Sequence, residues 1–458
     1  NKDKKMSYEN EHLVIIGASA AGAKAAAKAK RDYPGLNISM FTKEKYTSYS
    51  ACGMPYYIKG EIKTLEELLV RTPEEFRKSG INVFTHHEIL DINPAKKTIF
   101  AKNLQTQKII EYPYTKLLIA TGAKSITPNI EGINYNNIFQ IRTLQDSINI
   151  KNAMQKAKTA AIVGIGYVGL ELAEAFTYQG LNTKIIEKDS HIMNHLDDDM
   201  SDLLLDYTEK IPNIQTYINA HIKRFIPDNS GNVKQIEMKS GHIVDVDMVV
   251  IAIGVEPESK LAQSINLKLG PSGAIKVNEY MQTSIKDIFA AGDCTEKTHL
   301  VTQKPVFIPL GTTANKEGRI VAQNLFENRY PFKGVIGSAI TKFYGFKAAI
   351  AGLGEEEAAK NNINYKSIVI SDIDMSGYMP EAKKITMKLV SAKNSNRILG
   401  AQIVGEGNVT QRINAIATAI SHGMTLDDYL KTDLPYAPPF STSIDITLTA
   451  AQLLKEKV

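Results

Sequence analysis

The stretch that decides the fold is TAAIVGIGYVGLELAEAFTYQG, residues 159–180. Its first part predicts a short buried strand, and its last part predicts a helix closed by Gly180. The turn between them, GIGYVG, has the glycine spacing of a dinucleotide-binding turn. Gly164 allows the tight bend, Gly166 lets a pyrophosphate approach the backbone, and Gly169 permits close helix–strand packing.

The strand that follows this helix, NTKIIEK (182–188), ends in an acidic residue. Glu187 stands where a carboxylate can accept hydrogen bonds from both ribose hydroxyls of NAD(H). Its charge would repel the 2′-phosphate of NADP(H), although Lys184 and Lys188 weaken that discrimination. With the phosphates at the helix N-terminus, the unit predicts binding of NAD(P)H, with NADH favoured.

A second unit of this kind lies near the N-terminus, where two apolar strands flank an Ala-rich helix (12–17, 37–42 and 21–31). Its turn, GASAAG, keeps Gly17 and Gly22 but has Ser19 at the middle glycine position. Serine is small, and its hydroxyl can donate a hydrogen bond to a phosphate. Thr42 stands where a ribose-binding acid is expected, and Lys43 follows it. Taken alone, this turn leaves open whether a dinucleotide binds.

Three further strands run into glycine turns: KLLIATGA (116–123), DMVVIAIGVEP (247–257) and DIFAAGD (287–293). The chain thus carries two dinucleotide turns, an ATG segment and an AAGD segment. Their order resembles that of the FAD-dependent pyridine nucleotide–disulfide oxidoreductases, and the resemblance covers essentially the full length of the chain. The resemblance implies an α/β fold. Two Rossmann-like dinucleotide-binding domains, as in glutathione reductase, would precede a C-terminal α+β dimerisation domain.

The resemblance also implies the cofactors, FAD on the first turn and the nicotinamide dinucleotide on the second. Asp293 would bind the ribityl chain, and the helix in GTTANKEGR (311–319) would point its positive N-terminus at the flavin pyrimidine. Glu171 would line the nicotinamide pocket, unless it is a plain solvated helix residue. The FAD set is Gly17, Ser19, Gly22, Thr42, Lys43, Thr121, Gly122, Asp293 and Thr313. The nicotinamide set is Gly164, Gly166, Gly169, Glu171, Glu187 and Gly254.

The same resemblance predicts three domains. An FAD domain would comprise residues 1–148 and 272–328, and an NAD domain would comprise 149–271. A C-terminal interface domain would comprise 329–458. Because relatives complete each active site with the partner subunit, we expect a homodimer.

The chain has only two cysteines, Cys52 and Cys294, which excludes a disulfide framework and a structural zinc site. Cys52 lies in SYSACGMPYYIKG (48–60), just before a predicted helix with Pro55 in its first turn. A thiol at a helix N-terminus has a lowered pKa, so we expect a reactive Cys52. Cys294 follows the predicted flavin-binding aspartate, and we expect it to be structural.

Cys52 has no cysteine partner four or five residues away, so a second sulfur or oxygen must come from the substrate. A lone thiol can form a mixed disulfide with coenzyme A or be oxidised to a sulfenic acid. These routes correspond to two branches that the chain resembles. One contains coenzyme A–disulfide reductase and its persulfide- or polysulfide-reducing kin, and the other contains NADH oxidase and NADH peroxidase.

Local features favour the reductase branch. Oxidases and peroxidases of the family usually carry a histidine inside the first glycine turn, and that position is Ala20 here. CGMPYY also resembles the reductase pattern CxLPYY. In the reductases two tyrosines reach the sulfur of the other subunit. These tyrosines correspond to Tyr378 and Tyr436 here, whose alternative role is to pack at the subunit interface. The competing functions are a water-forming NADH oxidase or NADH peroxidase and, more remotely, a non-catalytic flavin redox sensor.

Composition sets broader limits. Hydrophobic residues make up 43% of the chain and the net charge is +5, typical of a globular protein without a basic stripe for nucleic acid. No apolar run is long enough to span a membrane, and the polar N-terminus does not resemble a signal peptide. We expect a cytoplasmic protein that binds no metal, nucleic acid or membrane. Three basic residues could meet the phosphates of coenzyme A, or simply be surface charges: Lys28, Arg31 and Arg71.

Overall fold

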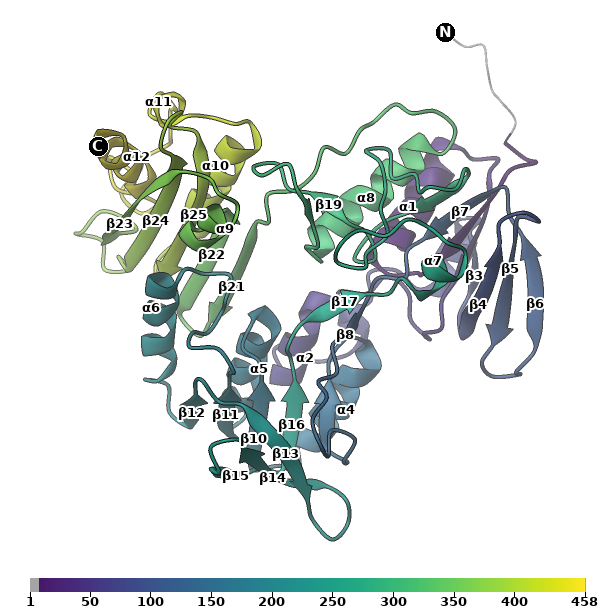
Figure 1. The fold of residues 1–458 in the computed structure, drawn as a ribbon, viewed down its shortest axis with the longest axis horizontal. Coiled ribbons are helices and arrows are strands. Elements are labelled where there is room, and N and C mark those ends of the chain that lie inside the picture. Colours follow the sequence, from purple (N-terminus) through teal and green to yellow (C-terminus); the bar gives the residue numbers. More distant parts are fainter. Residues whose placement is uncertain (1–7, 458) are drawn as a thin grey trace.

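The computed structural model describes residues 8–457, which form three units built on five-stranded sheets (Figure 1). Most of the polar N-terminal stretch, for which the sequence predicts no signal peptide, lies outside these residues. Within residues 8–457, no helix is long and apolar enough to cross a membrane.

The first sheet is parallel and has the strand order β18-β7-β1-β2-β3. Alternate side chains of β1 face opposite layers, as the two-residue period of a strand requires. Leu13 and Ile15 pack against helices α1 and α8, whereas Val14 and Ile16 pack toward the antiparallel sheet β4-β5-β6. The bounds are β1 (His12–Ile16), β2 (Asn37–Phe41), β3 (Asn82–Phe84), β7 (Lys116–Ile119), β18 (Ile288–Ala290), β4 (His87–Asn93), β5 (Thr98–Asn103), β6 (Ile109–Pro113), α1 (Ala20–Asp32) and α8 (Gly311–Asn324).

The second sheet repeats this plan with the order β12-β11-β10-β16-β9. Ile162 packs toward helix α5, and Val163 packs toward the antiparallel sheet β13-β14-β15. Because β9 pairs with β16, the chain enters this sheet ahead of residue 149, the predicted start of the NAD domain. The bounds are β9 (Ile138–Gln140), β10 (Thr159–Val163), β11 (Asn182–Ile186), β12 (Ile214–Tyr217), β16 (Met248–Ile251), β13 (Ile222–Pro227), β14 (Val233–Met238), β15 (Ile243–Asp245), α5 (Tyr167–Tyr178) and α6 (Asp198–Thr208).

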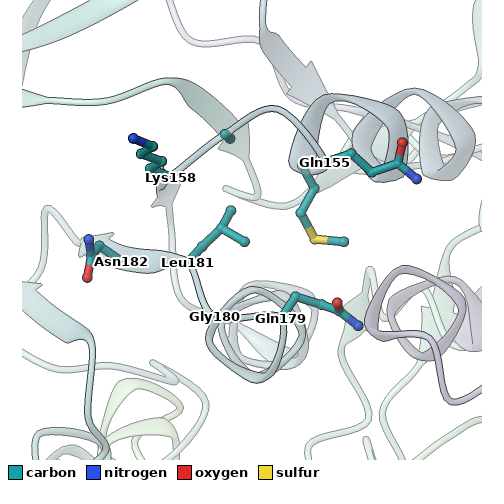
Figure 2. A pocket seen from close by; sticks show the side chains of 8 residues that line it. Gln155, Lys158, Gln179, Gly180, Leu181 and Asn182 are labelled. Atoms are coloured by element: carbon teal, nitrogen blue, oxygen red, sulfur yellow. The ribbon is translucent and has the colours of Figure 1, made fainter.

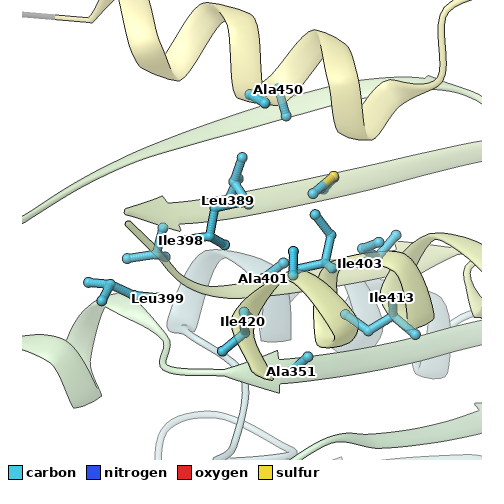
Figure 3. Close-up of a cluster of buried hydrophobic side chains, with 14 of the residues drawn as sticks. Ala351, Leu389, Ile398, Leu399, Ala401, Ile403, Ile413, Ile420 and Ala450 are labelled. Atoms are coloured by element: carbon cyan, nitrogen blue, oxygen red, sulfur yellow. The ribbon is translucent and has the colours of Figure 1, made fainter. Parts of the chain in front are cut away.

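The C-terminal unit is an antiparallel sheet of order β21-β22-β25-β24-β23. Figure 3 shows its core, where Leu389 and Ile403 lie between Ile413 and Ile420 of α10 and Ala450 of α12. The alternating segments 383–390 and 397–405 are strands, as predicted. The bounds are β21 (Ala339–Phe343), β22 (Phe346–Gly352), β23 (Tyr365–Ile373), β24 (Lys384–Ala392), β25 (Ile398–Gly405), α9 (Glu355–Lys360), α10 (Thr410–Ser421), α11 (Leu426–Tyr429) and α12 (Ile446–Glu456).

Short elements connect these units and shape the site. The most important is α2 (Met54–Lys59), which begins directly after the 3₁₀ turn Ala51–Gly53. It leaves the first unit to pack against α5 and α4 (Leu144–Met154) of the second unit (Figure 1). The others are α3 (Pro73–Lys78), β8 (Ala123–Ser125), β17 (Val255–Pro257), α7 (Lys260–Ser264), β19 (Lys297–Thr298), β20 (Pro305–Val306) and the 3₁₀ turn Glu66–Leu68.

The predicted fold class is confirmed: two Rossmann-like α/β units precede an α+β unit.

Candidate redox site

The first glycine turn forms a cradle at the start of α1, and two of its positions have no room for a side chain. Gly17 has a φ of +107°, and a Cβ there would collide with the Ala120 carbonyl at the end of β7. A Cβ on Gly22 would likewise collide with the Gly17 carbonyl. Ser19 caps α1, but its hydroxyl makes no capping hydrogen bond and is exposed. A phosphate at this helix N-terminus would therefore meet free backbone N–H groups and a free hydroxyl.

The second glycine turn has the same construction at the start of α5. Gly164 has a φ of +89°, and a Cβ on it would lie 2.8 Å from the Ala252 carbonyl oxygen. A Cβ on Gly166 would meet nothing within 4 Å, so this residue leaves an open approach to the helix N-terminus. The Tyr167 hydroxyl is buried and has no hydrogen-bond partner within residues 8–457. An open cradle and a spare buried polar group fit a dinucleotide.

Glu187 is held at this second turn by the backbone. Its Oε2 accepts a hydrogen bond from the Ile165 N–H at 3.1 Å, and its Oε1 accepts one from the Asp189 N–H at 3.1 Å. The carboxylate predicted to bind the ribose is thus fixed beside the predicted phosphate site. The remaining predicted contact, Gly254, follows β16 with a φ of +105°.

Cys52 lies in the 3₁₀ turn that leads into α2 and is exposed. The prediction that its helix position lowers the thiol pKa is wrong for the isolated chain. Although the residue is exposed, neighbouring protein shields its thiol in part from water and so raises the Cys52 pKa; the carboxylates of Glu171 and Asp293 raise that pKa further, while Arg142 lowers it. The helix dipole lowers the Cys52 pKa little because α2 has only six residues. Its N-cap, Gly53, also follows Cys52 in the chain, so the thiol lies outside the helix.

These shifts show which predicted residues the fold brings together. Cys52, Glu171 on α5 and Asp293 after β18 lie within electrostatic reach of one another. Burial raises the pKa of Glu171 to about 7, and Glu174 adds to the effect. The nearby residues Thr341 and Lys342 of β21 work against it, so the C-terminal unit also contributes to this site.

Arg142 is a site residue that sequence reasoning missed. One guanidinium nitrogen pairs with Asp293 Oδ2 at 2.9 Å, and its Nε donates to the Ala123 carbonyl at 3.0 Å. Arg142 thereby joins the first residue of β8 to the predicted ribityl-binding carboxylate. The sequence offers only a weak signal, a basic residue just before the capping box that Thr143 and Asp146 form at the start of α4.

Other predicted FAD contacts lie at the ends of the first sheet's strands. Thr121 Oγ1 donates to the Glu258 carbonyl at 2.6 Å, and Gly122 has a φ of +73°. Thr42 Oγ1 accepts from the Glu44 N–H at 3.2 Å, and Lys43 is exposed. Thr313 is buried in the first turn of α8, whose N-cap Leu310 supplies no side-chain capping group.

Cys294 is fully buried, with its Sγ 3.4 Å from the Ala291 carbonyl oxygen. Its burial agrees with the predicted structural role. Tyr378 and Tyr436 are 73% and 49% exposed on the C-terminal unit. Their two loops meet where the Ser376 N–H donates to the Pro438 carbonyl. Within residues 8–457 no hydrogen bond joins either tyrosine to Cys52, so a role at the thiol stays a prediction that requires a second subunit.

The three basic residues predicted to bind phosphate differ in their surroundings. Lys28 pairs with Asp32 at 2.6 Å. Arg71 lies 4.3 Å above the Phe76 ring and donates to the Glu75 carbonyl. Arg31 is exposed in the last turn of α1. Their role toward coenzyme A stays a prediction.

A surface cavity of about 420 Å³ lies away from this site (Figure 2). It is formed where α4 and α5 end and is lined by Gln155, Lys158, Gln179 and Leu181, among others. Because both glycine turns and Cys52 lie elsewhere, this cavity is not part of the redox site.

Comparison with known proteins agrees with this architecture. Residues 11–318 match the pyridine nucleotide-disulphide oxidoreductase family, and residues 338–447 match the dimerisation domain of that family. The chain therefore belongs to the pyridine nucleotide-disulphide oxidoreductases, whose typical cofactors, FAD and NAD(P)H, fit the two cradles described above.

Individual relatives cover nearly the whole chain. It is 32% identical to the NAD(P)H coenzyme A polysulfide/persulfide reductase of Pyrococcus horikoshii, over 97% of this chain and 98% of the relative. It is 31% identical to an NADH oxidase of Enterococcus faecalis, over 93% and 96%. The solved structure of an NAD-dependent persulfide reductase from A. fulgidus superposes with a TM-score of 0.94 and 34% identity, over 97% and 83%.

Proposed function

We propose that this protein uses NAD(P)H, with NADH preferred, to reduce coenzyme A disulfide or a related coenzyme A persulfide or polysulfide through FAD and Cys52. The observation that carries the proposal is the state of the two cysteines. Cys52 is exposed beside the predicted flavin and nicotinamide residues, whereas Cys294 is fully buried. The fully buried Cys294 is not accessible to Cys52 as a disulfide partner, so the second sulfur or oxygen must come from the substrate.

The thiol chemistry divides into two balanced steps. The Cys52 thiolate attacks the disulfide of the substrate, forms a Cys52–coenzyme A mixed disulfide and releases one coenzyme A thiolate. FAD, which the first glycine turn would hold, and NADH, which the second would hold, would supply the electron pair that reduces this mixed disulfide. Cys52 thiolate and a second coenzyme A thiolate result. Arg142 is the cation that favours the Cys52 thiolate in the isolated chain.

The test compares the parent with Cys52→Ser under anaerobic conditions. The parent should oxidise NADH when coenzyme A disulfide is added, and the variant should lose this turnover while its bound flavin is still reduced by NADH. If the variant reduces coenzyme A disulfide at the parent rate, the proposal is wrong. Cys294→Ser serves as the control and should keep the parent rate if its folding is preserved.

The second candidate is a water-forming NADH oxidase or NADH peroxidase in which Cys52 cycles through a sulfenic acid. The similarity to the Enterococcus faecalis oxidase favours it. Against it, the charged groups that shift the Cys52 pKa beyond the effect of burial are the carboxylates of Glu171 and Asp293 and the guanidinium of Arg142; no histidine of residues 8–457 is among them. Oxygen consumption that matches NADH oxidation, without turnover of coenzyme A disulfide, would establish this alternative.

We also propose that the protein acts as a cytoplasmic homodimer. The match to a dimerisation domain supports the dimer, as do the exposed apolar residues on adjacent loops of the C-terminal unit: Tyr378, Tyr436, Phe440 and Ile444. Light scattering coupled to size-exclusion chromatography should give twice the chain mass of 50.5 kDa. A mass of one chain would contradict the dimer.

A further inference from the structure

The turn that presents Asp293 is anchored at the preceding residue, Gly292. This glycine has a φ of +88° and lies between α1 and α8, since a Cβ on it would be 3.0 Å from Ala21 Cβ and 3.7 Å from Ala314 Cβ. Its backbone conformation is one that other residues rarely adopt. The peptide group between Gly292 and Asp293 therefore sets the direction in which the Asp293 carboxylate leaves the sheet.

Two buried charges hold the two polar backbone groups of Gly292. The Gly292 N–H donates to Glu317 Oε2 on α8 at 2.6 Å. The Gly292 carbonyl accepts from Lys297 Nζ on β19 at 2.7 Å. The side chains of Lys297 and Glu317 are 1% and 0% exposed. Thr295 completes the arrangement because its hydroxyl donates to the Gly292 carbonyl at 2.8 Å and lies 3.0 Å from Glu317 Oε2.

Stabilisation of the fold alone does not explain the buried ion pair of Lys297 and Glu317. Lys297 Nζ and Glu317 Oε1 are 3.6 Å apart, and Oε1 has no hydrogen-bond partner within residues 8–457. The cost of desolvating two charges often equals or exceeds what such a pair returns. The two charges have a geometric effect, because their charge-assisted hydrogen bonds fix the two successive peptide groups that flank Gly292.

We propose that Lys297 and Glu317 are positioning residues for the flavin. Glu317 and Lys297 orient the two peptide groups on either side of Gly292 so that Asp293 faces the cofactor site, and each charge makes the other tolerable in the interior. Arg142 holds the far end of the same carboxylate at 2.9 Å. Asp293 is therefore fixed both through its backbone and at its side chain before a ligand arrives.

The experiment measures the rate at which the holoenzyme releases FAD, from the fluorescence of free flavin after dilution. We expect Lys297→Met to speed release about tenfold or more, because it removes a charge-assisted bond and leaves Glu317 buried without a counter-charge. Glu317→Gln should also speed FAD release. The glutamine NH2 group would face the Lys297 ammonium, and neither of these two hydrogen-bond donors could accept from the other. The double variant removes both charges yet keeps an acceptor for the Gly292 N–H, so its release rate should lie between those of the parent and the single variants.

Lys388→Met is the matched control. Lys388 is also 1% exposed and pairs with three carboxylates, but it lies on β24 of the C-terminal unit. It should lower the melting temperature and leave FAD release within twofold of the parent. If the Lys297 and Glu317 variants also lose only thermal stability, the pair has no positioning role and the proposal fails. If neither single variant folds, the double variant provides the test. Release of FAD from the double variant at the parent rate would overturn the proposal.

Discussion

Glu171 gives the sharpest quantitative prediction, because its half-buried carboxyl group lies near the thiol. Burial raises its pKa from 4.5 to about 7. The folded protein therefore holds a proton that the unfolded chain releases between these values. Stability from this group is fully present below pH 4.5 and is lost as the pH rises through 7. The full loss corresponds to about 3 kcal/mol, an upper value that residual solvent contact reduces to about 1–3 kcal/mol.

The perturbation is Glu171→Gln, which keeps the shape and removes the titration. At pH 8.5 the variant should be more stable than the parent by about 1–3 kcal/mol, whereas at pH 5 the difference should be below about 1 kcal/mol. The stability difference between variant and parent is measured from thermal unfolding at both pH values, monitored by circular dichroism. The exposed Glu88→Gln is the control and should show no such pH dependence. An equal change in melting temperature at pH 5 and pH 8.5 would refute the reasoning.

The same variant should alter the thiol. The Glu171 carboxylate raises the pKa of Cys52, so its removal should lower that pKa and shift the pH profile of Cys52 alkylation by iodoacetamide toward lower pH. Alkylation at Cys52 is followed by peptide mass spectrometry. A profile that stays in place would show that the charge at Glu171 does not reach the sulfur.

Three further predictions concern single charges. Arg142→Met should raise the pKa of Cys52 and slow its alkylation at pH 7, opposite in sign to the change at Glu171; faster alkylation would contradict this. Glu187→Gln should raise the ratio of kcat/KM for NADPH over NADH about tenfold, because it removes repulsion of the 2′-phosphate; an unchanged ratio in steady-state assays would show that Glu187 does not discriminate. Lys388→Met should cost about 3 kcal/mol, because it leaves Asp197 and its neighbouring carboxylates without their buried cation, and an unchanged melting temperature would disprove it.

The glycine turns could be read from the sequence because their chemistry is local. A strand, a turn and a helix are contiguous, and Gly164 and Gly169 are required by contacts made within the same unit. The apolar alternation of 383–390 identified a strand for the same reason. Side chains two residues apart share a face wherever the strand sits.

The electrostatics of Cys52 could not be read locally. Helix position alone predicted a lowered pKa, but the groups that decide it lie on other segments: Glu171 on α5, Asp293 after β18 and Arg142 before α4. Arg142 and Asp293 are 151 residues apart in the chain. Nothing in a single sequence announces that pairing, and only the crossing of α2 onto the second unit brings the thiol to α5.

The charges around Cys52 are not equivalent, and this has a consequence for how the thiol titrates. Asp293 is already paired with Arg142, so the charge of Glu171 is the one left without a cation within hydrogen-bond distance in residues 8–457. Glu171 also titrates near 7. The Cys52 pKa is raised from its ordinary value, so the thiol ionises at higher pH than Glu171 and the carboxylate is already charged when the thiol loses its proton. The alkylation profile of the parent should therefore keep the shape of one ionisation, displaced to higher pH, and Glu171→Gln should move it to lower pH without changing its width.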